Sequence, residues 1–338
     1  MNRDGLTIAG WNHVIAHCAR RAAALVDDAW SLGVGVSIGP EAVQIIDCGV
    51  TVPGSYEAGR QIVELAQGGL ACAHVETVSI GGVAMPQIVV ESQAPWLSAY
   101  GLQVSVPLTE VSDAIRVSGP VVALFQDTRV LWADGRPNPG DEVCVAIVET
   151  NELPSADVVA AISESSGFPP ERLVLVVVPT RSVAGCTQVA GRINECVLFT
   201  LEECLGIPST RVTHLIGSAP IAPPWTRGVC GAVSPDDLIH YAGRAVVTMH
   251  CDGGIDPDHV ARNLAFESAP MCGQSFRELL AEADGVFEAI PRLSELNRVA
   301  QVSVIDQDGG AVYSAGRADE ELVAGWMRQF PKDRRCTR

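Results

Sequence analysis

The sequence predicts an α/β fold, because stretches with strand character alternate along the chain with stretches of helix character. Residues 173–178 (LVLVVV) form an unbroken apolar run that is typical of a buried strand. After a short turn of small and polar residues at 180–185, a helix pattern covers residues 188–205, and Gly206 and Pro208 end it. Two further strand and helix pairs repeat this order, at residues 43–50 with 55–67 and at residues 143–149 with 155–165.

The composition limits the class of protein. The 338 residues are 47% hydrophobic and 19% charged, which is enough for a sizeable core and for two domains, which we place at about 1–150 and 151–338. No apolar run reaches the roughly 18 residues of a membrane-spanning helix, and residues 1–4 lack the layout of a signal peptide, so we expect a cytoplasmic protein. The net charge of −17 argues against a nucleic-acid partner.

The other elements continue the alternation of strands and helices. Residues 75–93 predict two strands that meet at Gly81 and Gly82, and residues 212–223 predict a strand that enters a proline-rich loop. Residues 302–322 predict a strand, a turn at 308–310 and the start of a helix. Residues 11–32 predict an amphipathic helix whose apolar side carries Trp11, Val14, Ile15, Cys18, Ala22 and Leu25.

No metal or cofactor motif is present in the sequence. His13 and His17 have an i, i+4 spacing, but no glutamate follows His13, so we interpret both as residues on a helix face. The eleven cysteines are odd in number and form no Cys-x-x-Cys pair, so we expect most of them to be small buried residues. We also find no phosphate-binding or dinucleotide-binding glycine pattern, and we predict no metal, nucleotide or redox cofactor.

Arg192 and Glu195 are the charged pair that follows the buried strand at 173–178. Three residues apart on a helix, they would share one face. Their spacing alone is equally typical of an exposed ion pair, worth about 0.3–0.5 kcal/mol. Ligands of open α/β sheets bind at the ends of strands, however, and that is where this pair lies in the sequence.

Two long motifs resemble the methenyltetrahydromethanopterin cyclohydrolase family. Residues 46–59 read Ile-Asp-Cys-Gly-Val-x-Val-Pro-Gly-Ser-x-Glu-Ala-Gly, which is similar to the N-terminal signature of that family. Residues 179–195 are similar to its central motif, a Pro-Thr-x-Ser-x-Ala-Gly turn followed by an Ala-Gly-Arg-x-x-Glu helix. Shorter similarities lie at residues 118–125, 217–223 and 236–244, so that the resemblance covers roughly residues 10–330.

This resemblance implies a fold, a reaction and an assembly. The expected fold has two α/β domains that flank an active-site cleft, and the expected assembly is a homotrimer. The reaction would be hydrolysis of the methenyl bridge of a tetrahydropterin carrier of one-carbon units to its formyl derivative, without a cofactor. Glu195 would be the general base, and Arg192 would orient Glu195 and the substrate.

The resemblance also assigns residues that contact the substrate. Backbone N–H groups of a Gly-Pro turn could receive a substrate oxygen, although such a turn also serves simply to start a helix. Arg181 in particular could reach the substrate tail, as could Arg227 and Arg244, or it could be a solvated turn residue. The substrate-binding residues expected from the motifs are Ser118, Gly119, Pro120, Thr180, Arg181, Ser182, Ala219 and Pro220.

The sequence departs from the family at two basic positions. Some members of the family have an active-site lysine in the region that holds Tyr100 here, and the family pattern has a basic residue where this chain has Gln274. These departures leave a second hypothesis open: a divergent member that binds a reduced pterin or another one-carbon carrier but hydrolyses it poorly. A third hypothesis sets the resemblance aside and treats the chain as a soluble α/β protein that binds a small metabolite.

Overall fold

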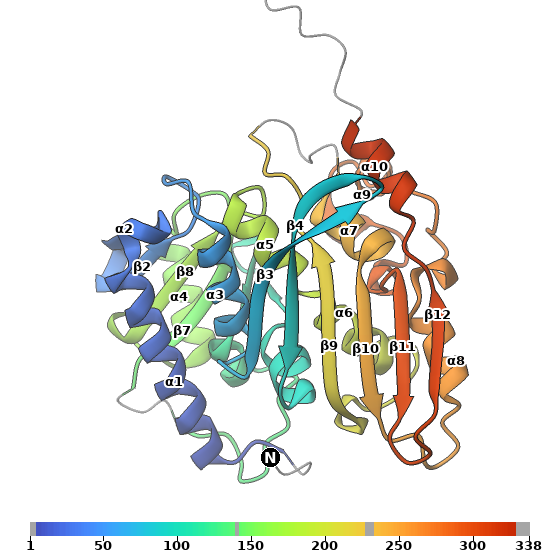
Figure 1. The fold of residues 1–338 in the computed structure, drawn as a ribbon. Coiled ribbons are helices and arrows are strands. Elements are labelled where there is room, and N and C mark those ends of the chain that lie inside the picture. The colour runs from blue at the N-terminus through green and yellow to red at the C-terminus, as the bar shows by residue number, and fades with distance from the viewer. Residues whose placement is uncertain (1–4, 139–141, 227–232, 329–338) are drawn as a thin grey trace, which may run out of the picture.

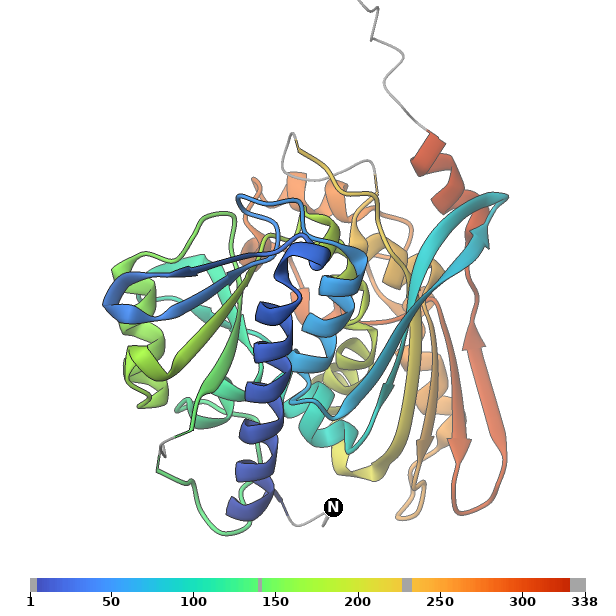
Figure 2. The ribbon, with the colours of Figure 1, turned by 60° about the vertical axis from the view of Figure 1, so that its left-hand side comes forward.

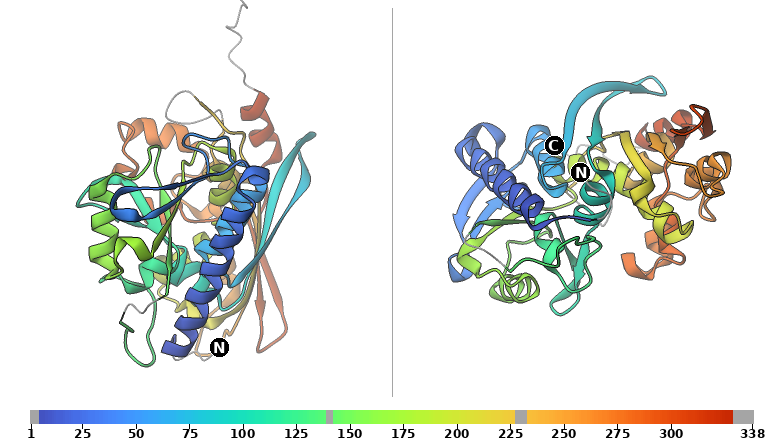
Figure 3. Two further views of the ribbon diagram at one scale, coloured as in Figure 1. Left: turned by 90° about the vertical axis from the view of Figure 1, so that its left-hand side faces the viewer. Right: turned by 90° about the horizontal axis from the view of Figure 1, so that it is seen from below.

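A computed structural model describes residues 5–138, 142–226 and 233–328. The described chain is mixed α/β, as predicted, and its strands form two six-stranded sheets that lie next to each other (Figure 1). Each sheet has its own cluster of buried apolar side chains, so the molecule has two cores. Seen from below, the N-terminal helix and the C-terminal helices lie on opposite sides of the molecule (Figure 3).

The first sheet has the strand order β1-β2-β8-β7-β6-β5. Strands β2, β8 and β7 are parallel, with β2 residue Gln44 opposite Val174 and β7 residue Cys144 opposite Leu173. All six residues of β8 are buried, which confirms the buried strand predicted from the apolar run. The strands are β1 (Gly35–Ile38), β2 (Gln44–Asp47), β5 (Val106–Leu108), β6 (Ser112–Ser118), β7 (Cys144–Glu149) and β8 (Leu173–Val178).

Among the described residues, five α-helices lie between residues 5 and 190. The apolar side predicted for the N-terminal helix is buried at all six positions, from Trp11 to Leu25. This helix runs beside α3, as Figure 2 shows, and the hydroxyl of Ser55 caps α3 by accepting from the N–H of Ala58 at 3.1 Å. The helices are α1 (Ile8–Asp27), α2 (Ala29–Leu32), α3 (Tyr56–Ala66), α4 (Ala156–Ser166) and α5 (Val183–Ala190).

The second sheet has the strand order β12-β11-β10-β9-β4-β3, and all neighbours are antiparallel except β10 and β11. Helices α6, α7 and α8 cover one face of this sheet (Figure 1), and Ile216 and Val246, on two of its strands, are exposed. The strands are β3 (Ala71–Ile80), β4 (Val83–Ser92), β9 (Val212–Pro220), β10 (Arg244–Met249), β11 (Gln301–Asp306) and β12 (Val312–Gly316), and the helices are α6 (Ile193–Phe199), α7 (Pro235–Ala242), α8 (Pro257–Leu264), α9 (Phe276–Glu282) and α10 (Glu320–Arg328).

The chain crosses between the two sheets more than once. The hairpin of β3 and β4 joins the second sheet, β5 to β8 return to the first sheet, and β9 to β12 belong to the second sheet again. The N–H of Gly81 at the hairpin tip donates to Glu320 of α10 at 3.2 Å. Strands from both sides of residue 150 therefore contribute to the first sheet, and the domain boundary placed there stays a prediction.

The helix predicted at residues 188–205 is wrong in its bounds. It begins earlier, at Val183, because Ser182 caps it, and it breaks at Gly191 and Arg192 before α6 begins at Ile193. A π-helical turn, Thr200–Cys204, then ends it. α3 packs closely against this break, because a Cβ at Gly191 would lie 2.3 Å from Cγ2 of Val63 in α3. Glycine at position 191 thus lets the end of α5 approach α3.

Candidate active site

The two long motifs of the sequence pack against each other. Asp47 ends β2, and its carboxylate accepts from the N–H groups of Gly49, Val50 and Thr51 at 2.7–2.9 Å, which fixes the loop after the strand. The hydroxyl of Ser182 donates to the carbonyl of Cys48 at 3.3 Å and accepts from the start of α5. The first motif therefore supports the loop that positions the second, and the spacing of both motifs is explained by this contact.

α5 lies between the two cores. Ala184 belongs to the core of the first sheet, whereas Cys186 belongs to that of the second. A Cβ at Gly59 of α3 would lie 2.5 Å from Cβ of Thr187, so glycine lets α3 and α5 approach closely. The helix pair α5 and α6 thus holds Arg192 and Glu195 at the junction of the two sheets.

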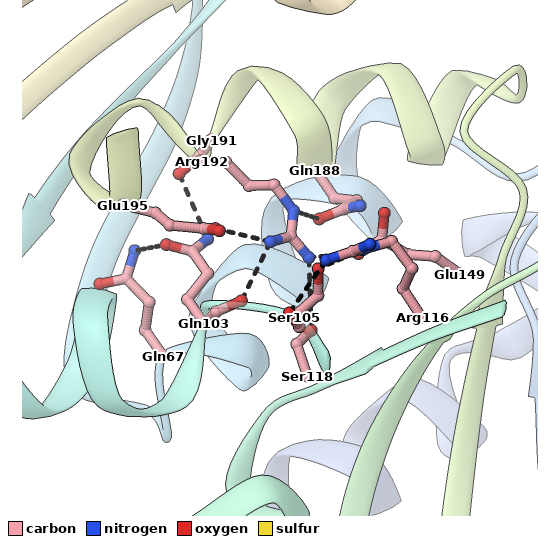
Figure 4. Close-up of polar contacts among 10 residues, drawn as sticks. All are labelled: Gln67, Gln103, Ser105, Arg116, Ser118, Glu149, Gln188, Gly191, Arg192 and Glu195. Carbon is pink, nitrogen blue, oxygen red and sulfur yellow. Dashed lines mark hydrogen bonds and ion pairs between the residues drawn. The ribbon is translucent and has the colours of Figure 1, made fainter. Parts of the chain in front are cut away.

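Arg192 is the centre of a buried polar network (Figure 4). Its Nη1 donates to Oε2 of Glu195 at 2.5 Å and to the carbonyl of Gln103 at 3.0 Å. Its Nη2 donates to Oε1 of Glu149, and Nη2 lies 3.4 Å from the hydroxyl of Ser118. The Arg192 side chain is 10% exposed and that of Glu195 is 13% exposed, so the exposed ion pair considered from spacing alone is not what the chain forms.

A second set of hydrogen bonds, among buried polar side chains, supports the backbone at Gly191. The amide of Gln103 donates to the carbonyl of Gly191 at 3.3 Å and accepts from Gln67 at 3.0 Å. Ser92 donates to Gln67 at 2.6 Å and accepts from Asn194 at 2.8 Å. The helix break at Gly191 is therefore fixed by the first core and by β4 of the second sheet, so that Arg192 and Glu195 are preorganised.

Burial and charge act in opposite directions on the two members of the pair. Burial raises the pKa of Glu195 to about 7; the Arg192 guanidinium opposes this rise, and the carboxylate of Glu149 adds to it. Burial lowers the pKa of Arg192, but the carboxylates of Glu149 and Glu195 outweigh that effect and raise it. Glu195 can thus exchange a proton near neutral pH, while Arg192 remains a cation.

Asp236, at the start of α7, is a further acidic residue of this region. Burial raises its pKa to about 7, with added contributions from Asp237 and Glu149. Asp237 caps the same helix instead, through Ser234, and accepts from the N–H of Phe276 at 2.6 Å. Of these two carboxyl groups, Asp236 is the one whose pKa is influenced by the charges of Glu149 and Arg192.

Of the predicted substrate-binding residues, Ser118 contacts the network directly. Gly119 follows with a φ of +91°, and its N–H donates to the carbonyl of Leu102 at 2.8 Å. That N–H group is therefore engaged within the protein, as expected for a tight turn, and Pro120 offers no N–H. Pro120 begins a buried 3₁₀ turn, Pro120–Leu124, that continues from β6.

The other predicted residues lie at the far end of α5 and on β9. Thr180 and Arg181 form the turn before α5, where the carbonyl of Arg181 accepts from Trp225 at 3.1 Å. Eight helical residues separate this turn from Gly191, a length of about 12 Å. Ala219 and Pro220 are buried at the end of β9 and pair with β4.

The remaining arginines and the two departures from the family have other partners. Arg244 pairs with Glu320 at 3.0 Å, and Arg227 lies outside the described residues. The hydroxyl of Tyr100 donates to Glu203 at 2.9 Å, and the amide of Gln274 donates to Glu282 at 3.0 Å. These side-chain hydrogen bonds of Tyr100 and Gln274 thus involve neither Arg192 nor Glu195.

Sequence reasoning missed several members of the network. Glu149 is the last residue of a predicted strand, so the rule that sites lie at strand ends could have found it. Gln103 and Gln188 carry no comparable signal; Gln188 accepts from Nε of Arg192 at 3.3 Å, while its own buried amide nitrogen has no partner among the described atoms. Arg116, on β6, also acts on the charge of Glu195.

Metal-binding clusters and membrane-spanning helices are both absent from the residues that the structure describes. These residues contain no group of three or more His, Cys, Asp or Glu side chains placed to hold a metal ion. In the same residues no helix has both the length and the apolar character required to cross a membrane. Nine cysteines lie in the described ranges, and five of them are buried, as expected for small core residues: Cys18, Cys48, Cys144, Cys186 and Cys196.

Comparison with known proteins identifies the family. The model of the family described as "Cyclohydrolase (MCH)" matches residues 14–325. The chain is 30% identical over 282 residues to methenyltetrahydromethanopterin cyclohydrolase of Methanospirillum hungatei, covering 83% of this chain and 87% of that protein. It is 28% identical over 312 residues to the protein of the same name from Methanothermobacter marburgensis, covering 90% and 95%. The chain therefore belongs to the cyclohydrolase (MCH) family of enzymes.

Proposed function

We propose that this enzyme hydrolyses the methenyl bridge of 5,10-methenyltetrahydromethanopterin, or of a closely related carrier, to the 5-formyl derivative. The observation that carries the proposal is the contact of 2.5 Å between Arg192 and Glu195, in a buried site where Glu195 is poised to exchange protons near neutral pH. The names of the relatives support the substrate, since they are called methenyltetrahydromethanopterin cyclohydrolases.

Glu195 accounts for the first proton transfer that the hydrolysis requires. The methenyl group is an amidinium-type cation, and a water molecule attacks its bridging carbon while Glu195 accepts a proton from that water. The C–OH group of the adduct loses its proton as the C=O bond forms and one C–N bond breaks. The nitrogen that leaves takes up one proton, so that one proton in total is released to solvent.

Arg192 serves this chemistry by position and charge. Its two carboxylate partners and its contact with the Gln103 carbonyl hold the guanidinium in one place. From that place it keeps Glu195 oriented by a charge-assisted hydrogen bond. We assign substrate contacts to Ser118, Gly119, Pro120, Thr180, Arg181, Ser182, Ala219 and Pro220, and of these Ser118 is the one that lies within reach of Arg192.

An absorbance assay with the methenyl pterin tests the proposal. Loss of the absorbance of the conjugated bridge on addition of enzyme, and release of one proton per turnover, would support it. Binding of the methenyl pterin without turnover would instead support the hypothesis of a divergent carrier-binding member. If the chain neither binds nor hydrolyses the compound, both assignments fail.

We also propose a homotrimer. The described helices α6, α7 and α8 cover one face of the second sheet, and on its strands Ile216, Val246 and Val312 are 43%, 40% and 62% exposed in the single chain. Sedimentation equilibrium gives the mass directly. A species of three times 35.6 kDa is the expected result, and a monomer at micromolar concentration would contradict it.

A further inference from the structure

Glu149 lies at the carboxyl end of β7 and points at the same guanidinium as Glu195. Its Oε1 accepts from Nη2 of Arg192, and its side chain is 10% exposed. Arg192 uses a different nitrogen, Nη1, for Glu195. One guanidinium therefore bridges a strand of the first sheet and a helix that packs on the second (Figure 4).

We propose that Glu149 is a positioning residue for the reaction at Glu195: it holds Arg192 in this bridge and keeps the site negative enough to favour a cationic substrate. The inference rests on the proposed function for the identity of the substrate. The arrangement of the three charges, in contrast, is a property of the described structure alone.

The contribution of Glu149 to binding of a cationic substrate follows from the net charge of the site. Arg192 and Arg116 are the cations that act on Glu195, and Glu149 acts on it as an anion. The charges of Glu149 and Arg192 also act on the pKa of Asp236 in α7, and the charge of Glu195 acts on the pKa of the Cys196 thiol. With the three carboxyl groups ionised, the site carries one net negative charge, and without Glu149 it is neutral. A buried site loses much of its attraction for a monocation when that charge is lost.

Glu149 also prevents complete neutralisation of Glu195 by Arg192. A carboxylate paired with an arginine that has no other partner titrates below its usual range, and is a weak base near neutral pH. Here burial raises the pKa of Glu195, and the Glu149 carboxylate contributes in the same direction. The same carboxylate contributes to the raised pKa of Asp236, so it acts on both acids of the site.

A glutamine at position 149 tests the charge while it preserves the shape. Arg192 would keep three neutral acceptors, the carbonyl of Gln103, the amide oxygen of Gln188 and the hydroxyl of Ser118. The amide oxygen of the glutamine can also still accept from Nη2, so the guanidinium should stay in the bridge and, without the charge of Glu149, be drawn more strongly to Glu195. Glu64→Gln is the matched control, because Glu64 is also a buried carboxylate with arginine partners, Arg21 and Arg60, but lies outside the network.

The experiment measures kcat and KM against pH, together with the titration of the Glu195 carboxyl by carbon-13 NMR in protein labelled at glutamate and assigned with Glu195→Gln. In Glu149→Gln we expect the Glu195 titration and the acid limb of kcat to move down by about one pH unit. We also expect KM for the cationic methenyl substrate to rise several-fold, with the affinity for the neutral formyl product nearly unchanged. Glu149→Asp should restore part of both effects, and Glu64→Gln should show neither.

The outcomes separate the two proposals. If the wild-type chain does not hydrolyse the methenyl pterin, the proposed function fails, yet the NMR titration still tests the effect of Glu149 on Glu195. If Glu195 titrates at the same pH in wild type and in Glu149→Gln, the positioning role of Glu149 is overturned. A uniform loss of kcat at all pH values, with a fall in melting temperature and no movement of the titration, shows a structural role and also overturns it.

Discussion

Nη1 of Arg192 lies 2.5 Å from Oε2 of Glu195, and both side chains are almost entirely buried. In Glu195→Gln the amide can still contact the guanidinium but cannot accept a proton from water. We expect kcat to fall by about 10²–10⁴-fold, whereas the affinity for the cationic substrate should fall only several-fold, as expected for the loss of one carboxylate charge from the site. Single-turnover kinetics with a separate binding titration measure both quantities. Turnover near the wild-type rate would show that Glu195 is not the base.

The activity should depend on pH in the neutral range. Burial raises the pKa of Glu195 to about 7, so the carboxylate that accepts the proton is lost as the pH falls through that value. We expect kcat to rise from pH 6 to pH 8 and then to level off. Initial rates in buffers of constant ionic strength measure this profile. A plateau that extends down to pH 5 would mean that the base titrates like an ordinary glutamate.

The contact between Arg192 and Glu195 could be predicted from the sequence, whereas its surroundings could not. The buried strand and the spacing of the two charges are local signals, and the structure confirms both. The close approach of Gly191 to Val63 in another helix, and the contact of Arg192 with Gln103, both depend on long-range folding of the chain. No periodicity or spacing within the motif itself contains that information.

The break at Gly191 can be tested by filling the space that the glycine leaves. The backbone of Gly191 is right-handed, with a φ of −72°, so alanine is permitted there, but its Cβ would lie 2.3 Å from Val63. We expect Gly191→Ala to cost about 1–3 kcal/mol of unfolding free energy through overpacking. Urea denaturation measures the change. Gly325→Ala is the control, since a Cβ there meets no atom within 4 Å, and alanine should be neutral or mildly stabilising in α10.

Asp236 should make the stability of the protein depend on pH. Burial raises the pKa of Asp236 to about 7 in the folded state, well above the value of an unfolded chain. The folded state thus binds more protons than the unfolded state between about pH 4 and pH 7, and this stability is lost as the pH rises. We expect Asp236→Asn to raise the melting temperature relative to wild type more at pH 8 than at pH 5. An equal difference at both pH values would contradict the raised pKa.

We propose Arg181 as the first arginine to test for contact with a charged substrate tail. It is exposed in the turn that opens α5, and its carbonyl is held by Trp225, so its side chain projects from a fixed backbone. A chain of net charge −17 would repel a tail with phosphate or carboxylate groups unless cationic side chains lie close to it. Arginines must supply these cations, because the described residues contain no lysine and the single Lys332 lies outside them. We expect Arg181→Ala to raise KM several-fold with kcat nearly intact, since a tail contact stabilises ground and transition states alike.

The effect of Arg181→Ala on KM should shrink as salt is raised from 10 mM to 500 mM, because screening weakens charge contacts between exposed groups. Arg262→Ala is the control, as that exposed arginine pairs with Asp258 in α8. An unchanged KM in Arg181→Ala at low salt would leave Arg181 as a solvated turn residue and direct attention to Arg244 and Arg227.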